Sequence, residues 1–139
     1  MKNISSPGST AFFKAVFAWV LLGLIGLPSL EAQTPLTNSN FQSAVNLWFS
    51  DETNATVTYG HISDWNVTGV TSMFKAFMDR TNFNEDISKW DVSNVTTMQY
   101  MLQGAHIFNQ DISNWDVSSV TNVNNFLSNA RAFNQDIGS

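Results

Sequence analysis

The stretch FNQDISNWDVSSV, residues 108–120, decides the fold because the chain repeats it. It occurs 25 residues earlier as FNEDISKWDVSNV, residues 83–95, with 10 of 13 positions identical. A third copy begins at Phe133, and a partial copy, ISDWNVTGV, runs over residues 62–70. Self-similarity at one fixed period is the sequence signature of a stacked repeat protein. The period divides the C-terminal part of the chain, 62–139, into repeats at 62–86, 87–111 and 112–136 and a truncated fourth at 137–139.

Each repeat opens with an alternating segment that predicts a strand. Trp90 and Val92 alternate with Lys89 and Asp91, and the next copy places Trp115 and Val117 in the same phase, which should turn both inward. Because indoles on the inward face belong to the core, we favour this interpretation over a row of exposed rings that stack on sugars.

The second part of each repeat has the spacing of a short helix. Thr96 recurs as Thr71 and Thr121 and is a suitable N-cap residue. Apolar residues then occur at i, i+3, i+4 and i+7, namely Met98, Met101, Leu102 and Ala105. The predicted fold class is α/β, a short right-handed solenoid of leucine-rich-repeat-like type. It has one short parallel strand plus one short helix per 25-residue repeat.

Residues 33–61 are predicted to form a linker and an N-terminal capping helix. Asn40 is placed as an N-cap for FQSAVNLWF, and the apolar face consists of Phe41, Ala44, Val45 and Trp48. Stacked repeats need such a cap over an open end, so we prefer it to a partner-binding amphipathic helix. Residues 51–56 are expected to be a loop and residues 57–59 a short strand.

Residues 1–32 have the pattern of a secretory signal peptide. Lys2 and Lys14 precede a 13-residue apolar run over 15–27, and cleavage after Ala32 is plausible. The run is shorter than the roughly 20 residues of a membrane-spanning helix. We therefore expect a secreted or cell-surface protein with no membrane insertion after signal cleavage, and an uncleaved anchor is the alternative.

Composition narrows the functional classes. The 139 residues suit one domain, and the absence of cysteine rules out disulfides and thiolate metal sites. A net charge of −5 argues against nucleic acid as a partner. The array stops within a predicted strand at residues 137–139, so we expect a fragment of a longer array, and an end that pairs with another chain is the alternative.

The repeat pattern F-N-Q-D-I-S-x-W-D-V-S-x-V-T-x-M-x-x-M resembles the BspA-like bacterial surface proteins, whose repeats have about 25–26 residues. The lead-in from Asn40 to Val67 also resembles the segment that often opens such arrays. This resemblance covers about 100 residues. It implies a secreted or surface-attached protein, often linked to adhesion, without enzymatic activity. The first repeat departs from the pattern at Arg80 and Ala76, which predicts different packing in an end unit.

Acidic residues recur in columns. Asp86, Asp111 and Asp136 form one column, and Asp91 and Asp116 form another that Asn66 continues. Such columns could bind calcium. We favour the structural interpretation, in which the side chains accept hydrogen bonds from turn backbone.

Catalysis has little support, since only His61 and His106 could act as general bases near neutral pH. We expect no enzyme, no cofactor and no metal. The leading hypothesis is a non-catalytic scaffold that binds a protein or glycan on another cell or matrix. Its alternative is a purely structural spacer of a longer surface protein. The expected interaction surface consists of Lys89, Asp91, Asn114, Asp116 and Ser118.

Overall fold

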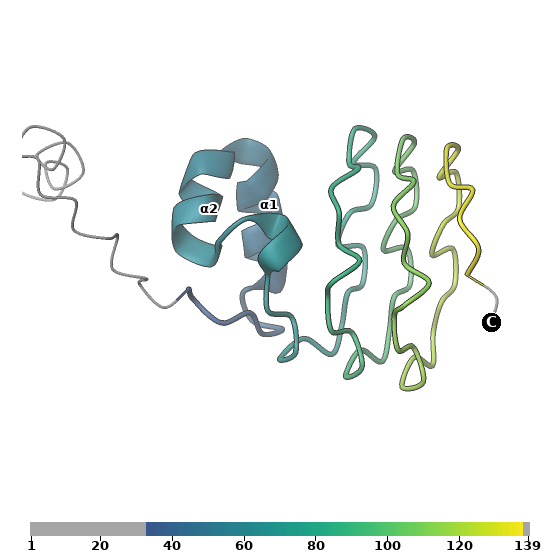
Figure 1. The fold of residues 1–139 in the computed structure, drawn as a ribbon, viewed down its shortest axis with the longest axis horizontal. Coiled ribbons are helices and arrows are strands. Elements are labelled where there is room, and N and C mark those ends of the chain that lie inside the picture. The colour runs from purple at the N-terminus through teal and green to yellow at the C-terminus, as the bar shows by residue number, and fades with distance from the viewer. Residues whose placement is uncertain (1–32, 138–139) are drawn as a thin grey trace, which may run out of the picture. The chain divides into compact units, whose positions relative to one another are not determined.

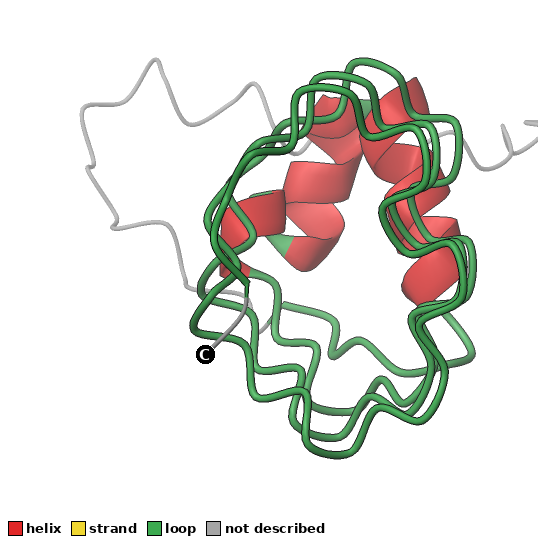
Figure 2. Ribbon diagram, turned by 90° about the vertical axis from the view of Figure 1, so that its right-hand side faces the viewer, coloured by secondary structure: helices red, strands yellow, loops and turns green. Residues whose placement is uncertain are grey.

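The computed structural model describes residues 33–137, so the predicted signal peptide lies outside the described residues. Helices α1 (Phe41–Ser50) and α2 (Glu52–Tyr59) and a short 3-10 helix, η1 (Ile62–Asp64), come first. Three stacked coils follow, which we call the first, second and third coil after the repeats 62–86, 87–111 and 112–136 (Figure 1). Along the stack the coils follow nearly the same path (Figure 2).

The strand-plus-helix solenoid predicted from the sequence is wrong. Residues 33–137 contain no strand, only isolated parallel bridges such as Ser72 to Thr97 and Thr97 to Asn122. The predicted strand is interrupted by two turns, in which Trp90 N–H donates to Ile87 O and Val95 N–H donates to Val92 O. The alternation was nevertheless a correct guide to burial, because Trp90 and Val92 are buried while Lys89 and Asp91 are exposed.

The predicted repeat helix is replaced by consecutive turns. Met101 N–H donates to Met98 O, and the same i to i+3 bond starts again at Tyr100 and at Leu102. Tyr100 and Gly104 have positive φ angles of 59° and 71°, which a right-handed helix excludes. The backbone N–H groups that make no bond within these turns donate to carbonyls of the next coil, so every second N–H forms a hydrogen bond between coils.

The stacking bonds form a regular ladder. In the first coil the amides of residues 73, 75, 77 and 79 donate to the carbonyls of residues 97, 99, 101 and 103 at 2.8–3.0 Å. The second coil repeats the pattern from residues 98, 100, 102 and 104 to residues 122, 124, 126 and 128. Thr96, predicted to be a helix cap, instead donates its N–H and its hydroxyl to Thr71 O. The alternate amides of these two rows donate toward the C-terminal end, whereas the N–H of Thr96 donates toward the N-terminal end.

Helix α1 is confirmed where the sequence placed it, and its buried face is the predicted one: Phe41, Ala44, Val45 and Trp48. The Asn40 side chain does not cap the helix. Its Oδ1 accepts a hydrogen bond from the N–H of Thr37, which lies three residues earlier in the chain. Helix α2 lies where a loop and a strand were expected. Asp51 caps it by accepting from Asn54 N–H, and Gly60, with φ of 83°, ends it.

The helices close the N-terminal end of the stack with both aromatic and polar contacts. Phe49 lies against Phe77 and Phe83, with ring centroids 6.4 and 5.9 Å apart. The Arg80 guanidinium lies 4.4 Å from the centre of the Phe49 ring and donates to Asn46 Oδ1. The expectation that the first repeat packs differently is therefore confirmed, because Arg80 contacts α1.

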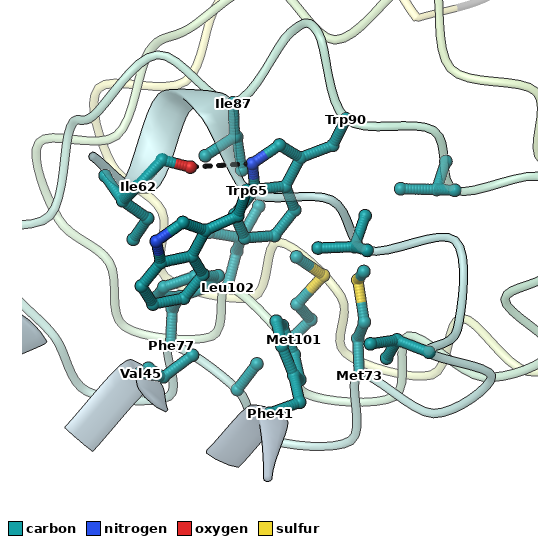
Figure 3. Close-up of a cluster of buried hydrophobic side chains, with 14 of the residues drawn as sticks. Phe41, Val45, Ile62, Trp65, Met73, Phe77, Ile87, Trp90, Met101 and Leu102 are labelled. Carbon is teal, nitrogen blue, oxygen red and sulfur yellow. Dashed lines mark hydrogen bonds between the residues drawn. The ribbon is translucent and has the colours of Figure 1, made fainter. Parts of the chain in front are cut away.

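The core runs through the coils as columns of equivalent residues, of which the Trp, Ile and Phe83–Phe108 columns are identical from coil to coil (Figure 3). Trp65 and Trp90 are stacked at 6.1 Å, and Phe83 and Phe108 at 5.6 Å. Each indole N–H donates to the backbone one coil back: Trp90 to Ile62 O at 2.8 Å, and Trp115 to Ile87 O at 3.1 Å. The predicted core position of the indoles is thus confirmed, and backbone carbonyls accept their N–H groups.

One core assignment fails in the third coil. Val67 and Val92 are 1% exposed, but Val117 is 50% exposed. In the described chain no further coil stacks on the third one, so this valine is uncovered although its phase is the same.

Candidate interaction surfaces

The surface expected from the sequence is exposed, but three of its five members, Asp91, Asp116 and Ser118, are already engaged in turns. Lys89, Asn114 and Ser118 are exposed. The carboxylate of Asp91 accepts from Ser93 N–H at 3.1 Å and from Ser93 Oγ at 2.6 Å. Asp116 accepts from Ser118 N–H at 3.0 Å. These bonds close an Asx turn in each coil and leave Lys89 and Asn114 as the variable side chains of this face.

The turn bonds stabilise the ionised carboxylates. The pKa of Asp91 is lowered from its ordinary value, chiefly by the Ser93 hydroxyl and then by the Ser93 amide. The pKa values of Asp86, Asp111 and Asp116 are lowered in the same way by Ser88, Ser113 and Ser118. Asn66 makes the same turn with Thr68 in the first coil, so the turn itself needs an acceptor oxygen and no charge.

The proposed calcium column is organised as separate turns. Asp86 accepts from Ser88 N–H at 3.0 Å and Asp111 accepts from Ser113 N–H at 2.9 Å, each within its own coil. Over residues 33–137 no group of three or more His, Asp or Glu side chains could hold a metal ion. The structural interpretation of the Asp columns is therefore confirmed at these two residues.

The asparagine column joins the coils directly. Asn84 Oδ1 accepts from Asn109 N–H at 2.8 Å, and Asn109 Oδ1 accepts from Asn134 N–H at 2.9 Å. Gln110 Nε2 donates to Asn84 O, which adds a second bond at the same corner. This polar column stabilises stacking and so explains why the asparagine recurs in every repeat.

Sequence reasoning missed an aromatic patch on the face where helices were expected. Phe74 is 45% exposed, and its ring meets Tyr100 of the next coil edge-on at 6.1 Å. The Lys75 ammonium lies 5.1 Å from the Phe74 ring centre and 5.7 Å from that of Tyr100. We call these three residues the aromatic patch. A comparison of the repeats could have revealed the patch, because the third coil has Asn124 and Asn125 at the positions of Phe74 and Lys75.

The second notable surface is the open end of the third coil. A cavity of about 570 Å³ lies there, and its walls are mainly apolar. Val117, Val123 and Ile137, each at least half exposed, are among its lining residues. Their counterparts in the second coil, Val92 and Met98, are 1% exposed. The cavity is thus the site where a further layer of core would lie.

The two histidines lie far apart in the sequence and make different contacts. His61 Nδ1 lies 2.8 Å from Ser63 Oγ, and its ring meets Trp48 edge-on at 4.9 Å, so this exposed side chain contacts both η1 and α1. His106 is half-buried, and its carbonyl accepts from Ala132 N–H of the third coil.

These features define a repeat protein of stacked, strand-free coils whose N-terminal end is closed by helices. The chain belongs to the family described as Mycoplasma protein of unknown function, DUF285, whose family model matches residues 38–139. No curated protein and no solved structure matches the chain. Among residues 33–137 no helix is long and apolar enough to cross a membrane.

Proposed function

We propose that this protein is a non-catalytic interaction scaffold that is secreted or displayed at the cell surface and binds a protein or glycan. One observation carries the proposal. Residues that recur unchanged, such as Trp90 and Asp91, lie in the core or form turns, whereas several exposed positions change from coil to coil. Phe74 corresponds to Gln99 and Asn124, and Lys75 corresponds to Tyr100 and Asn125. Variation at exposed positions suits recognition.

The aromatic patch is the best candidate for the contact within that face. Exposed aromatic rings beside a cation are typical of interface residues that contribute strongly to binding energy. The resemblance of the repeats to BspA-like surface proteins and the signal-like segment 1–32 support an extracellular location. The surface around Lys89 and Asn114 competes with the patch as the contact region.

Glycan arrays and pull-downs with the full chain test the proposal, and the third coil supplies fold-compatible substitutions. The patch variant combines Phe74→Asn, Lys75→Asn and Tyr100→Asn, which install the residues found at 124 and 125. Lys89→Asn, which installs the residue found at 114, is the matched control on the other face. We expect saturable binding that weakens about tenfold or more, or about 1.4 kcal/mol, in the patch variant only.

Other outcomes discriminate the alternatives. Loss of binding with Lys89→Asn and not with the patch variant would move the contact to the face around Lys89. An absence of saturable binding to any glycan or protein would favour the structural spacer over the scaffold.

A further inference from the structure

The aromatic patch is built on a backbone conformation that does not favour its side chains. Residues 75, 100 and 125 form one column of the stack, with φ angles of 58°, 59° and 55°. Asn tolerates this left-handed conformation, whereas it is unfavourable for Lys75 and Tyr100. A second left-handed column holds only residue types that suit it, namely Asp79, Gly104 and Asn129. Strained residues of this kind gather at functional sites, so we attribute the presence of Lys75 and Tyr100 to what their side chains bind.

The hydrogen-bond ladder and the rings hold the patch in one arrangement. Lys75 N–H donates to Gln99 O and Tyr100 N–H donates to Asn124 O, both at 3.0 Å. The rings of Phe74 and Tyr100 meet at 75°, and the Lys75 ammonium lies 5.1 and 5.7 Å from their centres. Attraction between the cation and the two ring faces fixes the ammonium beside both rings. A ligand would therefore meet a site that is already formed.

The Lys75 ammonium has no acidic partner among residues 33–137. Its contacts within this range are the two rings, and no carboxylate or carbonyl accepts its N–H groups. Arg80 in the same coil differs, because its guanidinium donates to Asn46 Oδ1. The chain has a net charge of −5, so an unpaired ammonium is unusual in it. Its three N–H donors suit an anionic group of a ligand, since hydrogen bonds between charged groups are stronger than neutral ones.

The groups around this ammonium suit a sugar. Phe74 is 45% exposed, so a ring face is available for the C–H groups of a sugar. Gln99, at the equivalent position of the second coil, accepts from Asn122 Nδ2 through its Oε1 at 3.2 Å. Its Nε2 makes no hydrogen bond within residues 33–137 and is available to a sugar hydroxyl. A single cation beside rings and amides matches a sugar with one carboxylate, whereas an acidic peptide segment would require several cations.

We propose that the aromatic patch binds an acidic glycan. A carboxylate of the glycan accepts hydrogen bonds from the Lys75 ammonium, the C–H face of the same sugar packs on Phe74, and hydroxyl groups bond to the Gln99 amide. The inference rests on the proposed function, because it names the ligand class of the same site. It adds that the charge of the ligand decides its binding.

A matched pair of probes isolates the carboxylate. Methyl glucuronide and methyl glucoside share one sugar ring, and a carboxylate in the first replaces the hydroxymethyl group of the second. In NMR titrations of the full chain, we expect the glucuronide to shift the signals of the patch with an affinity at least about fivefold higher. The preference should shrink at high salt, because exposed ionic contacts are screened. Acetate carries the anion alone and should bind at least about fivefold more weakly than the glucuronide.

Three variants assign the preference to individual side chains. Lys75→Gln removes the charge and should lower the affinity for glucuronide to that for glucoside. Phe74→Gln, which installs the residue found at 99, should weaken the binding of both sugars. Lys89→Gln is the matched control, because Lys89 is an exposed lysine outside the patch, and it should leave both affinities unchanged. An unchanged spectrum of α1 would verify that each variant folds.

The outcomes separate this inference from the proposed function. Equal affinity for the two sugars, reduced in Phe74→Gln, would refute the acidic preference and leave the scaffold proposal intact. The inference also fails if neither sugar binds, if acetate binds as tightly as glucuronide, or if Lys89→Gln weakens the glucuronide as much as Lys75→Gln does. Capture of an acidic protein by the patch without glucuronide binding would replace the glycan with a protein ligand. The scaffold proposal itself fails only when the arrays and pull-downs show no saturable binding.

Discussion

Trp90→Phe tests whether the indole column holds the coils together. Trp90 is 3% exposed, stacks on Trp65 at 6.1 Å, and contacts Phe41 edge-on at 5.9 Å. Its N–H donates to Ile62 O at 2.8 Å, and that carbonyl also accepts from Trp65 N–H. The substitution keeps an aromatic ring but removes the donor and part of the buried volume.

The expected cost follows from these two losses. The hydrogen bond contributes about 1 kcal/mol, and Ile62 O keeps its second partner, so no full desolvation penalty is added. The two ring carbons that phenylalanine lacks contribute about 0.8 kcal/mol each when buried. The free energy of unfolding should therefore fall by about 2 to 3 kcal/mol, or by about 10 to 20 °C in Tm for a domain of this size.

Trp115→Phe is the matched control. It removes the same kind of hydrogen bond, from Nε1 to Ile87 O at 3.1 Å, but Trp115 lines the open cavity and is 7% exposed. Less packing is lost there, so the cost should be about 1 kcal/mol smaller than for Trp90. Scanning calorimetry and urea unfolding followed by circular dichroism measure both variants. An equal or larger cost at Trp115 would refute the assignment of Trp90 to the interior of a continuous column.

Three further predictions concern the turns and the cap. Because the turn bonds lower the pKa of four aspartates, their contribution to stability is present above the ordinary Asp pKa of about 3.9 and is lost as pH falls through the lower folded value. When all four are changed to Asn, the residue that forms this turn at Asn66, the free energy of unfolding should fall less steeply as the pH is lowered. Urea midpoints measured below about pH 5 test this. An unchanged slope with pH would contradict it. These aspartates are Asp86, Asp91, Asp111 and Asp116. Gly104→Ala should lower the free energy of unfolding by about 1 kcal/mol in thermal melts, because the φ angle of Gly104 is +71° and an added Cβ would lie 2.5 Å from Asp79 Oδ1. Gly104→Asn should cost less if the left-handed backbone sets the penalty, because Asn tolerates that conformation better than Ala. Arg80→Ala removes the contact with the Phe49 ring and should lower the free energy of unfolding by about 0.5 to 1 kcal/mol. Amide hydrogen exchange in α1 should accelerate. Unchanged exchange in α1 would show that Arg80 does not stabilise the cap.

The period and the burial pattern could be predicted from the sequence, because equivalent positions in a stack share one environment. Met98, Met101, Leu102 and Ala105 are all buried, as their spacing indicated. Their conformation could not be derived from that spacing, since consecutive turns bury the same positions as a helix. The missed signal was the recurrence of Asp, Gly and Asn at residues 79, 104 and 129, residue types that tolerate positive φ.

Helix α2 was missed for a different reason. Its sequence ETNATVTY is rich in β-branched residues, which favours an extended prediction. The flanking residues did carry helix signals, with Asp51 as the cap, Glu52 in the first turn and Gly60 at the end. Only Ala55 of this helix is buried, and packing against α1 supplies what its propensity lacks.

The aromatic patch could not be found by looking for recurring residues, because it exists only where the copies differ. Repeats reveal the architecture through identity, and Trp90 or Asn109 stand out for that reason. A contact surface requires the opposite test, in which equivalent exposed positions are compared and the chemically distinctive ones are retained. That test selects Phe74, Lys75 and Tyr100 over Asp91 and Asp116, whose carboxylates are committed to turns.

The ladder also gives the stack a chemical direction that apolar packing alone would not. The ladder amides of residues 73–79 and 98–104 donate toward the C-terminal side, so this ladder presents carbonyls at one end and N–H groups at the other, whereas Thr96 and Thr121 donate their N–H groups in the opposite direction. The carbonyl end can be closed by donors on a helix, as Gln42 of α1 shows. The donor end requires acceptors at every second residue, which the exposed face of a helix does not offer because its carbonyls are bonded internally. A cap like α1 therefore suits the end that presents the ladder carbonyls and not the end that presents the ladder amides.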